Sequence, residues 1–159
     1  MADPQPGDYF VVRTNGWAGV LIRWVTRSTV NHAGILVNGG AVVEARPAGA
    51  GYAAARDYTA ATWSHFPLTD AQRVAIIGAA NGLVGTPYSW VDCACVGLAD
   101  LFGINVPEPV RKRLRRRDRL MCSQLVDTAY LDAGVHLFSD GRIPGAVSPG
   151  DLLNLIPKE

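Results

Sequence analysis

The strongest constraint on the fold is a β-hairpin signature between residues 32 and 46. Two apolar, β-branched segments, His32–Val37 and Ala41–Arg46, are separated by Asn38-Gly39-Gly40. Asn and Gly tolerate the positive φ angles that tight hairpin turns need. The sequence therefore predicts two antiparallel strands joined by a turn at residues 38–40.

The length of that turn decides which side chains share a face of the sheet. A three-residue turn pairs Gly34 with Glu44 and makes His32 and Glu44 diagonal neighbours on one face, whereas a two-residue turn puts them on opposite faces. In the first case the carboxylate of Glu44 orients the imidazole of His32, and the other ring nitrogen is free to take a proton from a thiol. The same arrangement is equally consistent with a polar cross-strand pair that has no catalytic role.

A second segment, which begins at Met121-Cys122-Ser123, predicts a short buried helix. Apolar residues recur at helical spacing after Cys122, and Gly134 ends the pattern. Cys122 would lie in or just before the first turn, where unpaired amide N–H groups and the helix dipole favour a thiolate over a thiol. The position suits a nucleophile, although most lone cysteines in such helices are core residues.

The remaining pattern predicts an α+β fold with an antiparallel sheet packed against helices, because strands largely precede helices in the chain. With 159 residues, 48% of them hydrophobic, the chain is long enough for one domain, which we expect to span residues 1–159. Further strands are expected at 8–13 and 62–68, a loop at 47–55, and helices at 17–25, at 70–84 behind a Thr69–Gln72 capping box, at 89–102, after Pro107, and from Ser148.

The three cysteines, Cys93, Cys95 and Cys122, do not form a disulfide framework, and Cys-Ala-Cys is not a usual zinc motif. The three histidines are scattered, so we expect no metal and no cofactor. The first residues lack the basic and apolar regions of a signal peptide, which predicts a protein made in the cytosol. A phage or injected protein would still act elsewhere without such a signal.

Five short segments occur in an order that is typical of one enzyme superfamily. They are Gly7-Asp8, Thr29-Val30-Asn31-His32-Ala33-Gly34-Ile35, Val43-Glu44-Ala45, Gly85-Thr86-Pro87-Tyr88 and Cys122-Ser123-Gln124-Leu125-Val126. The chain resembles the papain-like NlpC superfamily from Gly7 to Asp151, in the order of its circularly permuted, YiiX-like branch. The resemblance implies a cysteine hydrolase with Cys122 as nucleophile, His32 as base, Glu44 as the residue that orients the base, and Tyr88 in the substrate site.

One alternative assignment remains. Gly85-Thr86-Pro87-Tyr88-Ser89-Trp90, followed by Asp92-Cys93, also resembles the nucleophile segment of the unpermuted family, in which the cysteine precedes the histidine. That assignment needs a His-Gly-Ile strand after Cys93, and His136 is followed by Leu-Phe-Ser-Asp. We therefore prefer Cys122 and keep Cys93 in reserve.

A basic run precedes the expected nucleophile. Its seven basic residues and Asp118 give 111–119 a net charge of +6, and since the whole chain carries +1, the rest carries −5. The run is formed by Arg111, Lys112, Arg113, Arg115, Arg116, Arg117 and Arg119. A solvated helix face is the first interpretation, a patch for an anionic substrate or membrane surface the second, and nucleic-acid binding the last, since no nucleic-acid motif is recognisable.

The resemblance implies cleavage of an acyl bond through an acyl-enzyme, with a peptide, a peptidoglycan fragment or an acyl-lipid as substrate. Acyl transfer and thioester hydrolysis fit the same residues. Two other classes of function remain as alternatives: a binding module of the same fold without turnover, and a basic nucleic-acid-associated protein that uses the 111–119 run.

Overall fold

The computed structural model describes residues 3–15, 28–89 and 108–157. In this part the chain forms an antiparallel sheet of five strands in the order β4-β3-β2-β1-β5. The strands are β1 (Tyr9–Val12), β2 (His32–Leu36), β3 (Ala41–Arg46), β4 (Gly49–Ala54) and β5 (Thr62–Trp63). The helices are α2 (Asp70–Gly82), α4 (Glu108–Leu114), α5 (Cys122–Asp132) and α6 (Pro149–Leu155), with 3₁₀ turns η1 (Asn38–Gly40), η2 (Ala55–Asp57) and η3 (Pro144–Ala146). The α+β fold with an antiparallel sheet is confirmed.

The hairpin forms in the register that a three-residue turn predicts. Gly34 pairs with Glu44, and η1 connects the two strands. Gly39 and Gly40 have φ angles of 74° and 71°, which glycine adopts without steric cost. The turn residues therefore set the register that puts His32 and Glu44 on one face.

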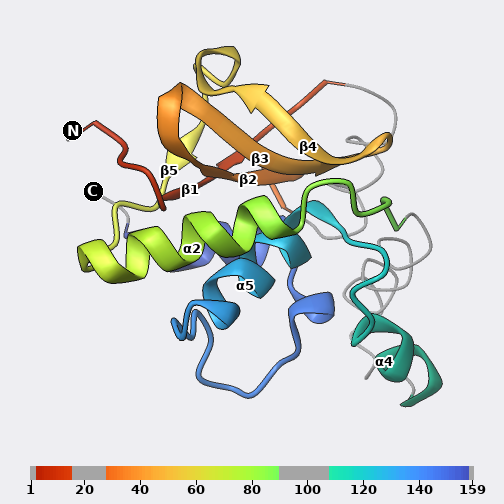
Figure 1. The fold of residues 1–159 in the computed structure, drawn as a ribbon. Helices are drawn as coiled ribbons and strands as arrows, with labels where there is room; N and C mark the ends of the chain where they lie inside the picture. The colour runs from red at the N-terminus through yellow and green to blue at the C-terminus, as the bar shows by residue number, and fades with distance from the viewer. Residues whose placement is uncertain (1–2, 16–27, 90–107, 158–159) are drawn as a thin grey trace.

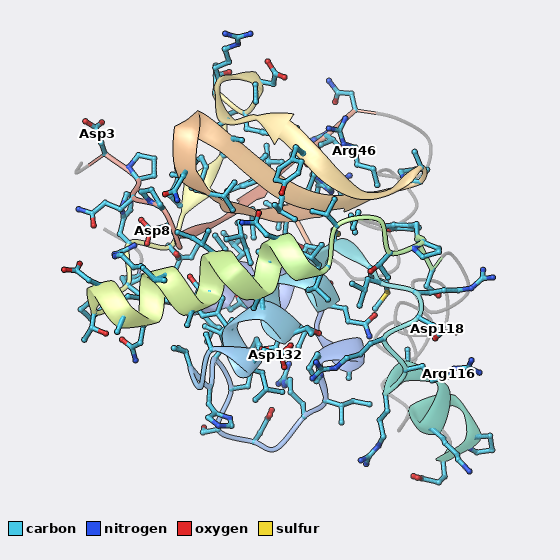
Figure 2. The ribbon with its side chains drawn as sticks, in the orientation of Figure 1. Asp3, Asp8, Arg46, Arg116, Asp118 and Asp132 are labelled. Atoms are coloured by element: carbon cyan, nitrogen blue, oxygen red, sulfur yellow. The ribbon has the colours of Figure 1, made fainter. Side chains whose placement is uncertain are left out.

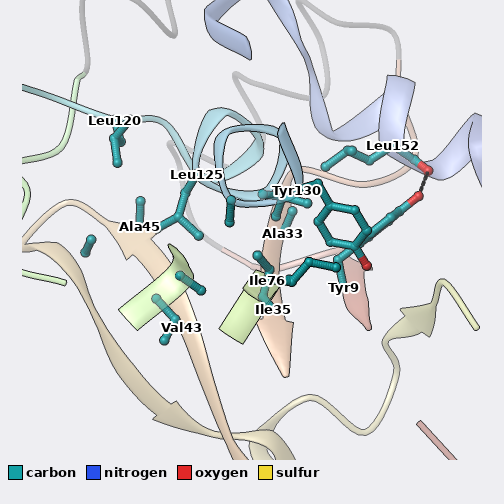
Figure 3. Close-up of a cluster of buried hydrophobic side chains, with 14 of the residues drawn as sticks. Tyr9, Ala33, Ile35, Val43, Ala45, Ile76, Leu120, Leu125, Tyr130 and Leu152 are labelled. Carbon is teal, nitrogen blue, oxygen red and sulfur yellow. Dashed lines mark hydrogen bonds between the residues drawn. The ribbon is translucent and has the colours of Figure 1, made fainter. Parts of the chain in front are cut away.

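Helices α2 and α5 lie on the same side of the sheet and bury the main core against it (Figure 1). Alternate residues of the central strands point to this side of the sheet. Among them, Ile35 and Val43 pack against Ile76 of α2 and Leu125 of α5 (Figure 3). The residues between them, which point to the opposite face of the sheet, form a smaller cluster that includes Phe10. This alternation is what period-two strands between two apolar layers produce.

The N-terminal turn at Gly7-Asp8 is held by both covering helices. The guanidinium group of Arg73 on α2 donates to the carboxylate of the buried Asp8 at 3.0 Å and to the carbonyl of Pro6 at 3.0 Å. The hydroxyl of Tyr130 on α5 donates to the carbonyl of Gly7 at 2.6 Å. The start of β1 is thereby fixed to the helical layer.

The predicted loop at 47–55 is wrong in its main part, because residues 49–54 form β4. Every residue of β4 pairs with β3, from Gly49 with Arg46 to Ala54 with Ala41. Gly and Ala have low strand propensity, so the side chains gave no strand signal, and the backbone pairing decides the structure. On its other side Ala50 exchanges hydrogen bonds with Gly85 and Thr86 at 2.9 and 2.8 Å.

Other predicted elements differ in length. The strand expected at 62–68 ends after Trp63, and His65, with a φ angle of 45°, interrupts the extended backbone. The helix expected at 70–84 ends at Gly82, and its predicted Thr69–Gln72 capping box is present. Helix α4 ends at Leu114, so only the first part of the basic run is helical. The helix expected at 17–25 lies outside the described residues, as does the helix expected at 89–102 apart from its first residue, Ser89.

Replacing Gly34 by Ala tests the packing beneath the hairpin. A Cβ atom at residue 34 would lie 2.7 Å from Cε1 of Phe10 and 2.9 Å from the carbonyl oxygen of Val43. Since a backbone carbonyl cannot move without disturbing the ladder, we expect Gly34→Ala to lower the free energy of unfolding by about 1–3 kcal/mol in urea titrations.

Gly51→Ala is the matched control, because Gly51 pairs with the same residue, Glu44, from the other side and has open space at its Cβ position. That variant should change the free energy of unfolding by less than about 0.5 kcal/mol. Equal losses in both variants would contradict the packing described for Gly34.

Candidate active site

His32 and Glu44 form the centre of the candidate site. Nε2 of His32 lies 2.5 Å from Oε2 of Glu44, within hydrogen-bond distance, as the register predicts for diagonal neighbours. The side chain of Glu44 has no exposed surface, and that of His32 is 12% exposed. A buried carboxylate needs partners that replace its lost hydration, and His32 is one of them.

Cys122 is the first residue of α5, as the sequence predicts, and Met121 is the N-cap residue. It is 3% exposed. The first amide groups of a helix have no intrahelical partner, so the N–H of Cys122 is available at the helix end where the dipole is positive. His32 begins β2 and Cys122 begins α5, two elements that pack against each other.

The electrostatics of His32 show how closely the three side chains are coupled. Burial lowers the pKa of His32, but hydrogen bonds to Cys122 and Glu44 and the charges of these two groups outweigh burial and raise the pKa to about 9. The imidazolium form is therefore favoured at neutral pH. Since Nε2 faces Glu44, Nδ1 is the ring nitrogen that remains for Cys122.

Two further partners of Glu44 were not found from the sequence. The hydroxyl of Tyr58 donates to Oε2 at 2.5 Å, and the guanidinium group of Arg46 forms an ion pair with Oε1. Burial alone would raise the pKa of Glu44, but its hydrogen bond to His32, the charge of His32, the bond from Tyr58 and the charge of Arg46 lower it below 4.5. Glu44 is thus held as a carboxylate.

The sequence contained a signal for one of these partners and none for the other. Arg46 lies two residues after Glu44 on β3. Because successive side chains of a strand point to opposite faces, these two point to the same face. Figure 2 shows Arg46 at the sheet. Tyr58 follows η2, fourteen residues from Glu44 in an irregular segment, so no periodicity places it. Its ring packs on Phe10 with centroids 4.5 Å apart and lies 6.1 Å from the ring of His32.

Tyr88 lies in a segment that pairs with the residues just before Cys122. It forms a parallel bridge with Leu120, supported by bonds from the amide of Leu120 to the carbonyl of Pro87 at 2.9 Å and from the amide of Ser89 to the carbonyl of Leu120 at 3.1 Å. Leu120 is two residues before Cys122. The segment of Tyr88 is therefore brought to the edge of the site, while its role in substrate binding stays a prediction.

The first turn of α5 is fixed by its own polar side chains. The hydroxyl of Ser123 donates to the carbonyl of Val147 at 2.6 Å. The amide group of Gln124 donates to the carbonyls of Leu114 and Arg116 at 3.2 and 3.3 Å, and its oxygen accepts from the amide of Met121 at 3.3 Å. These buried contacts hold Cys122 in place relative to the end of α4.

Cys93, the reserve nucleophile, lies outside the described residues, so the alternative assignment stays a prediction. Within the ranges that the structure describes, no group of three or more His, Cys, Asp or Glu side chains is placed to hold a metal ion. No helix in the same ranges is long and apolar enough to cross a membrane.

Comparison with known proteins identifies the fold. No protein-family model matches the chain, and no curated protein matches its sequence. Among solved structures, the chain is similar to the metalloprotein YiiX from Escherichia coli O157:H7, with a TM-score of 0.63. The match has 20% sequence identity and covers 90% of this chain and 78% of YiiX.

The chain has the YiiX fold. The histidine strand precedes the cysteine helix in the chain, as the order of the sequence segments predicts. At 20% identity the likeness to YiiX shows the fold alone. The described residues offer no cluster that fits a metal, so no step proposed below involves one.

Replacing Tyr58 by Phe tests its bond to Glu44. A hydrogen bond to a buried carboxylate contributes about 1.5–3 kcal/mol, so Tyr58→Phe should lower the free energy of unfolding by that amount at pH 7. Because the bond lowers the pKa of Glu44, its stabilising effect is present above pH 4.5 and is lost as acid protonates the carboxylate. Urea titrations at several pH values should show the difference from wild type narrowing below pH 4.5.

Tyr52→Phe is the control, because the hydroxyl of Tyr52 donates to Asn81 at an exposed site. Its effect should stay below about 0.5 kcal/mol at every pH. A difference between Tyr58→Phe and wild type that does not change with pH would mean that Tyr58 acts by packing alone.

Proposed function

We propose that the protein is a cysteine hydrolase of the peptidase or amidase type, with Cys122 as nucleophile, His32 as acid–base residue and Glu44 as the residue that orients His32. The observation that carries the proposal is the coupling of His32 to two partners at once: Nε2 bonds to the buried Glu44, and Cys122 contributes to the raised pKa of the ring. A cysteine, an imidazole and an orienting acid are the parts that covalent catalysis by a thiol requires.

In the proposed reaction, His32 is an imidazolium that already holds the proton of the Cys122 thiol, and the sulfur of Cys122 attacks the carbonyl carbon of an acyl substrate. The oxygen of the tetrahedral intermediate accepts a hydrogen bond from the amide of Cys122, and one such donor contributes roughly 3 kcal/mol. His32 then protonates the leaving amine or alcohol as its bond to carbon breaks. The acyl group remains on Cys122 as a thioester.

Water completes the cycle. His32 removes a proton from a water molecule, which attacks the thioester carbonyl, and the carbon–sulfur bond breaks to release the carboxylic acid and restore Cys122. An alcohol or amine in place of water would give acyl transfer by the same steps. Glu44 keeps the imidazole in the orientation that faces Cys122, and Tyr58 and Arg46 keep Glu44 ionised. Tyr88 is proposed to line the substrate site.

Acyl-enzyme formation on an activated ester such as p-nitrophenyl butyrate tests the proposal. Wild type should show a burst of nitrophenol and a butyryl adduct on Cys122 by mass spectrometry. Both should disappear in Cys122→Ala, and His32→Ala should slow the burst by about 10²–10⁴-fold, the contribution of a general base.

Cys93→Ser and His136→Ala are the matched controls and should keep the burst. If the adduct forms on Cys93, or if Cys122→Ala retains full activity, the assignment of the nucleophile is wrong. Peptides, peptidoglycan fragments and lipid esters can then be compared as substrates on the same readout.

A further inference from the structure

The basic run lies directly beside the candidate site and is not part of a regular helix over its full length. Helix α4 ends at Leu114, and residues 115–119 connect it to Leu120 and the start of α5. Lys112 and all residues from 115 to 119 are exposed. Figure 2 shows Arg116 and Asp118 beside α4.

The backbone of this segment is anchored to the site. Leu114 and Leu120, at its two ends, are 1% and 0% exposed. Gln124 in the first turn of α5 bonds to the carbonyls of Leu114 and Arg116. Gly145 packs so closely on Leu114 that a Cβ atom at 145 would lie 2.2 Å from its carbonyl oxygen. The backbone that carries these cations is therefore held in place at both of its ends.

Among the cations whose side chains the structure describes, two have acidic partners within the described residues and others do not. Arg116 pairs with Asp118 at 2.9 Å, and Arg117 pairs with Asp132 at 2.8 Å. The structure describes the side chains of three other cations of the run, Lys112, Arg115 and Arg119, and none of these three pairs with a carboxylate of the described residues. Like charges so close together repel one another, so their clustering does not stabilise the fold.

The distance to the candidate nucleophile is short. Arg119 is three residues before Cys122, so their Cα atoms are at most about 11 Å apart. That separation is close to the screening length in physiological salt, roughly 8 Å. The backbone of Arg119 is thus close to that of Cys122.

We infer that the exposed side chains of Lys112 and of residues 115–119 dock the protein on an anionic lipid membrane, from which an acyl-lipid substrate reaches Cys122. Exposed cations bind a single small anion weakly because solvent screens each pair, whereas a membrane presents many anions at once. Each basic residue near an anionic membrane strengthens binding about fivefold. The docking surface stands by itself, and the statement about the substrate rests on the proposed function.

The same charges favour a membrane over nucleic acid for two reasons. Residues 108–120 contain no aromatic side chain to stack on a base and no Asn or Gln to read one. The rest of the chain carries −5, which disfavours a long polyanion that wraps around the molecule, whereas a membrane touches one side only.

Vesicle sedimentation with the full chain tests the docking surface. The probes are phosphatidylcholine vesicles with and without phosphatidylserine, in low and high salt, and the protein carries Cys122→Ser so that turnover plays no part. We expect binding only with phosphatidylserine, and weaker binding in high salt. Arg115→Gln/Arg119→Gln should weaken binding about 25-fold, since two basic residues are lost.

Arg13→Gln/Arg56→Gln removes the same charge from two exposed residues elsewhere and should keep at least half of the binding. Equal losses in both double variants would mean that net charge, and not this surface, attracts the vesicles. No binding, or binding to a DNA or RNA duplex without binding to vesicles, would overturn the inference.

A second readout separates the inference from the proposed function. With Cys122 present, Arg115→Gln/Arg119→Gln should slow hydrolysis of a lipid ester in phosphatidylserine vesicles and leave hydrolysis of p-nitrophenyl butyrate unchanged. If neither ester is hydrolysed by wild type, the proposed function fails while vesicle binding still decides the docking surface. If both esters are affected equally, the statement that this surface brings an acyl-lipid substrate to Cys122 is wrong, the hydrolase stands, and vesicle binding still decides the docking surface.

Discussion

The burial of the Glu44 carboxylate is the constraint on which the site depends. A carboxylate without exposed surface loses its hydration, which is costly unless charged and hydrogen-bonding partners replace the water. Here His32, Tyr58 and Arg46 do so, from β2, from the segment after η2 and from β3 itself. Because the carboxylate needs all three, the hairpin register and the position of Tyr58 are tied to one another. Gly34, which pairs with Glu44, leaves room for the ring of Phe10 and for the Cβ atom of Glu44.

The second requirement is that the start of α5 meets the start of β2. The two elements are ninety residues apart in sequence, and the main core brings them together through residues such as Ile35 and Leu125. Polar contacts then fix the details: Ser123 bonds to the segment before α6, and Gln124 bonds to the end of α4. The helix terminus that holds Cys122 is thus positioned by side chains of its own first turn, which follow the cysteine directly in the sequence.

The parts of this structure that were predictable carry local signals. The hairpin was predictable because Asn38-Gly39-Gly40 marks a tight turn between two apolar segments, although two turn lengths remained open. The capping box was predictable because Thr69 and Gln72 have the required spacing, and α5 because its apolar spacing ends at Gly134. The approach of His32 to Glu44 followed from the register alone. The order of the segments was enough to predict the YiiX-like fold.

The parts that were missed depend on contacts between distant residues. Strand β4 is made of glycine, alanine and one tyrosine, so its pairing with β3 left no pattern of side chains. Tyr58 reaches Glu44 from an irregular segment, and only the folded chain shows that contact. The end of α4 at Leu114 follows from packing against Gly145 and Gln124, which the basic run itself does not encode.

The most direct test of the central claim is an NMR titration of the three histidines in protein with labelled histidine side chains. The imidazole of His32 should titrate near pH 9, and its midpoint should fall in Cys122→Ala and in Glu44→Gln, because each variant removes a partner that favours the imidazolium. A midpoint near 6.5 that is the same in wild type and both variants would contradict the coupling of Cys122, His32 and Glu44.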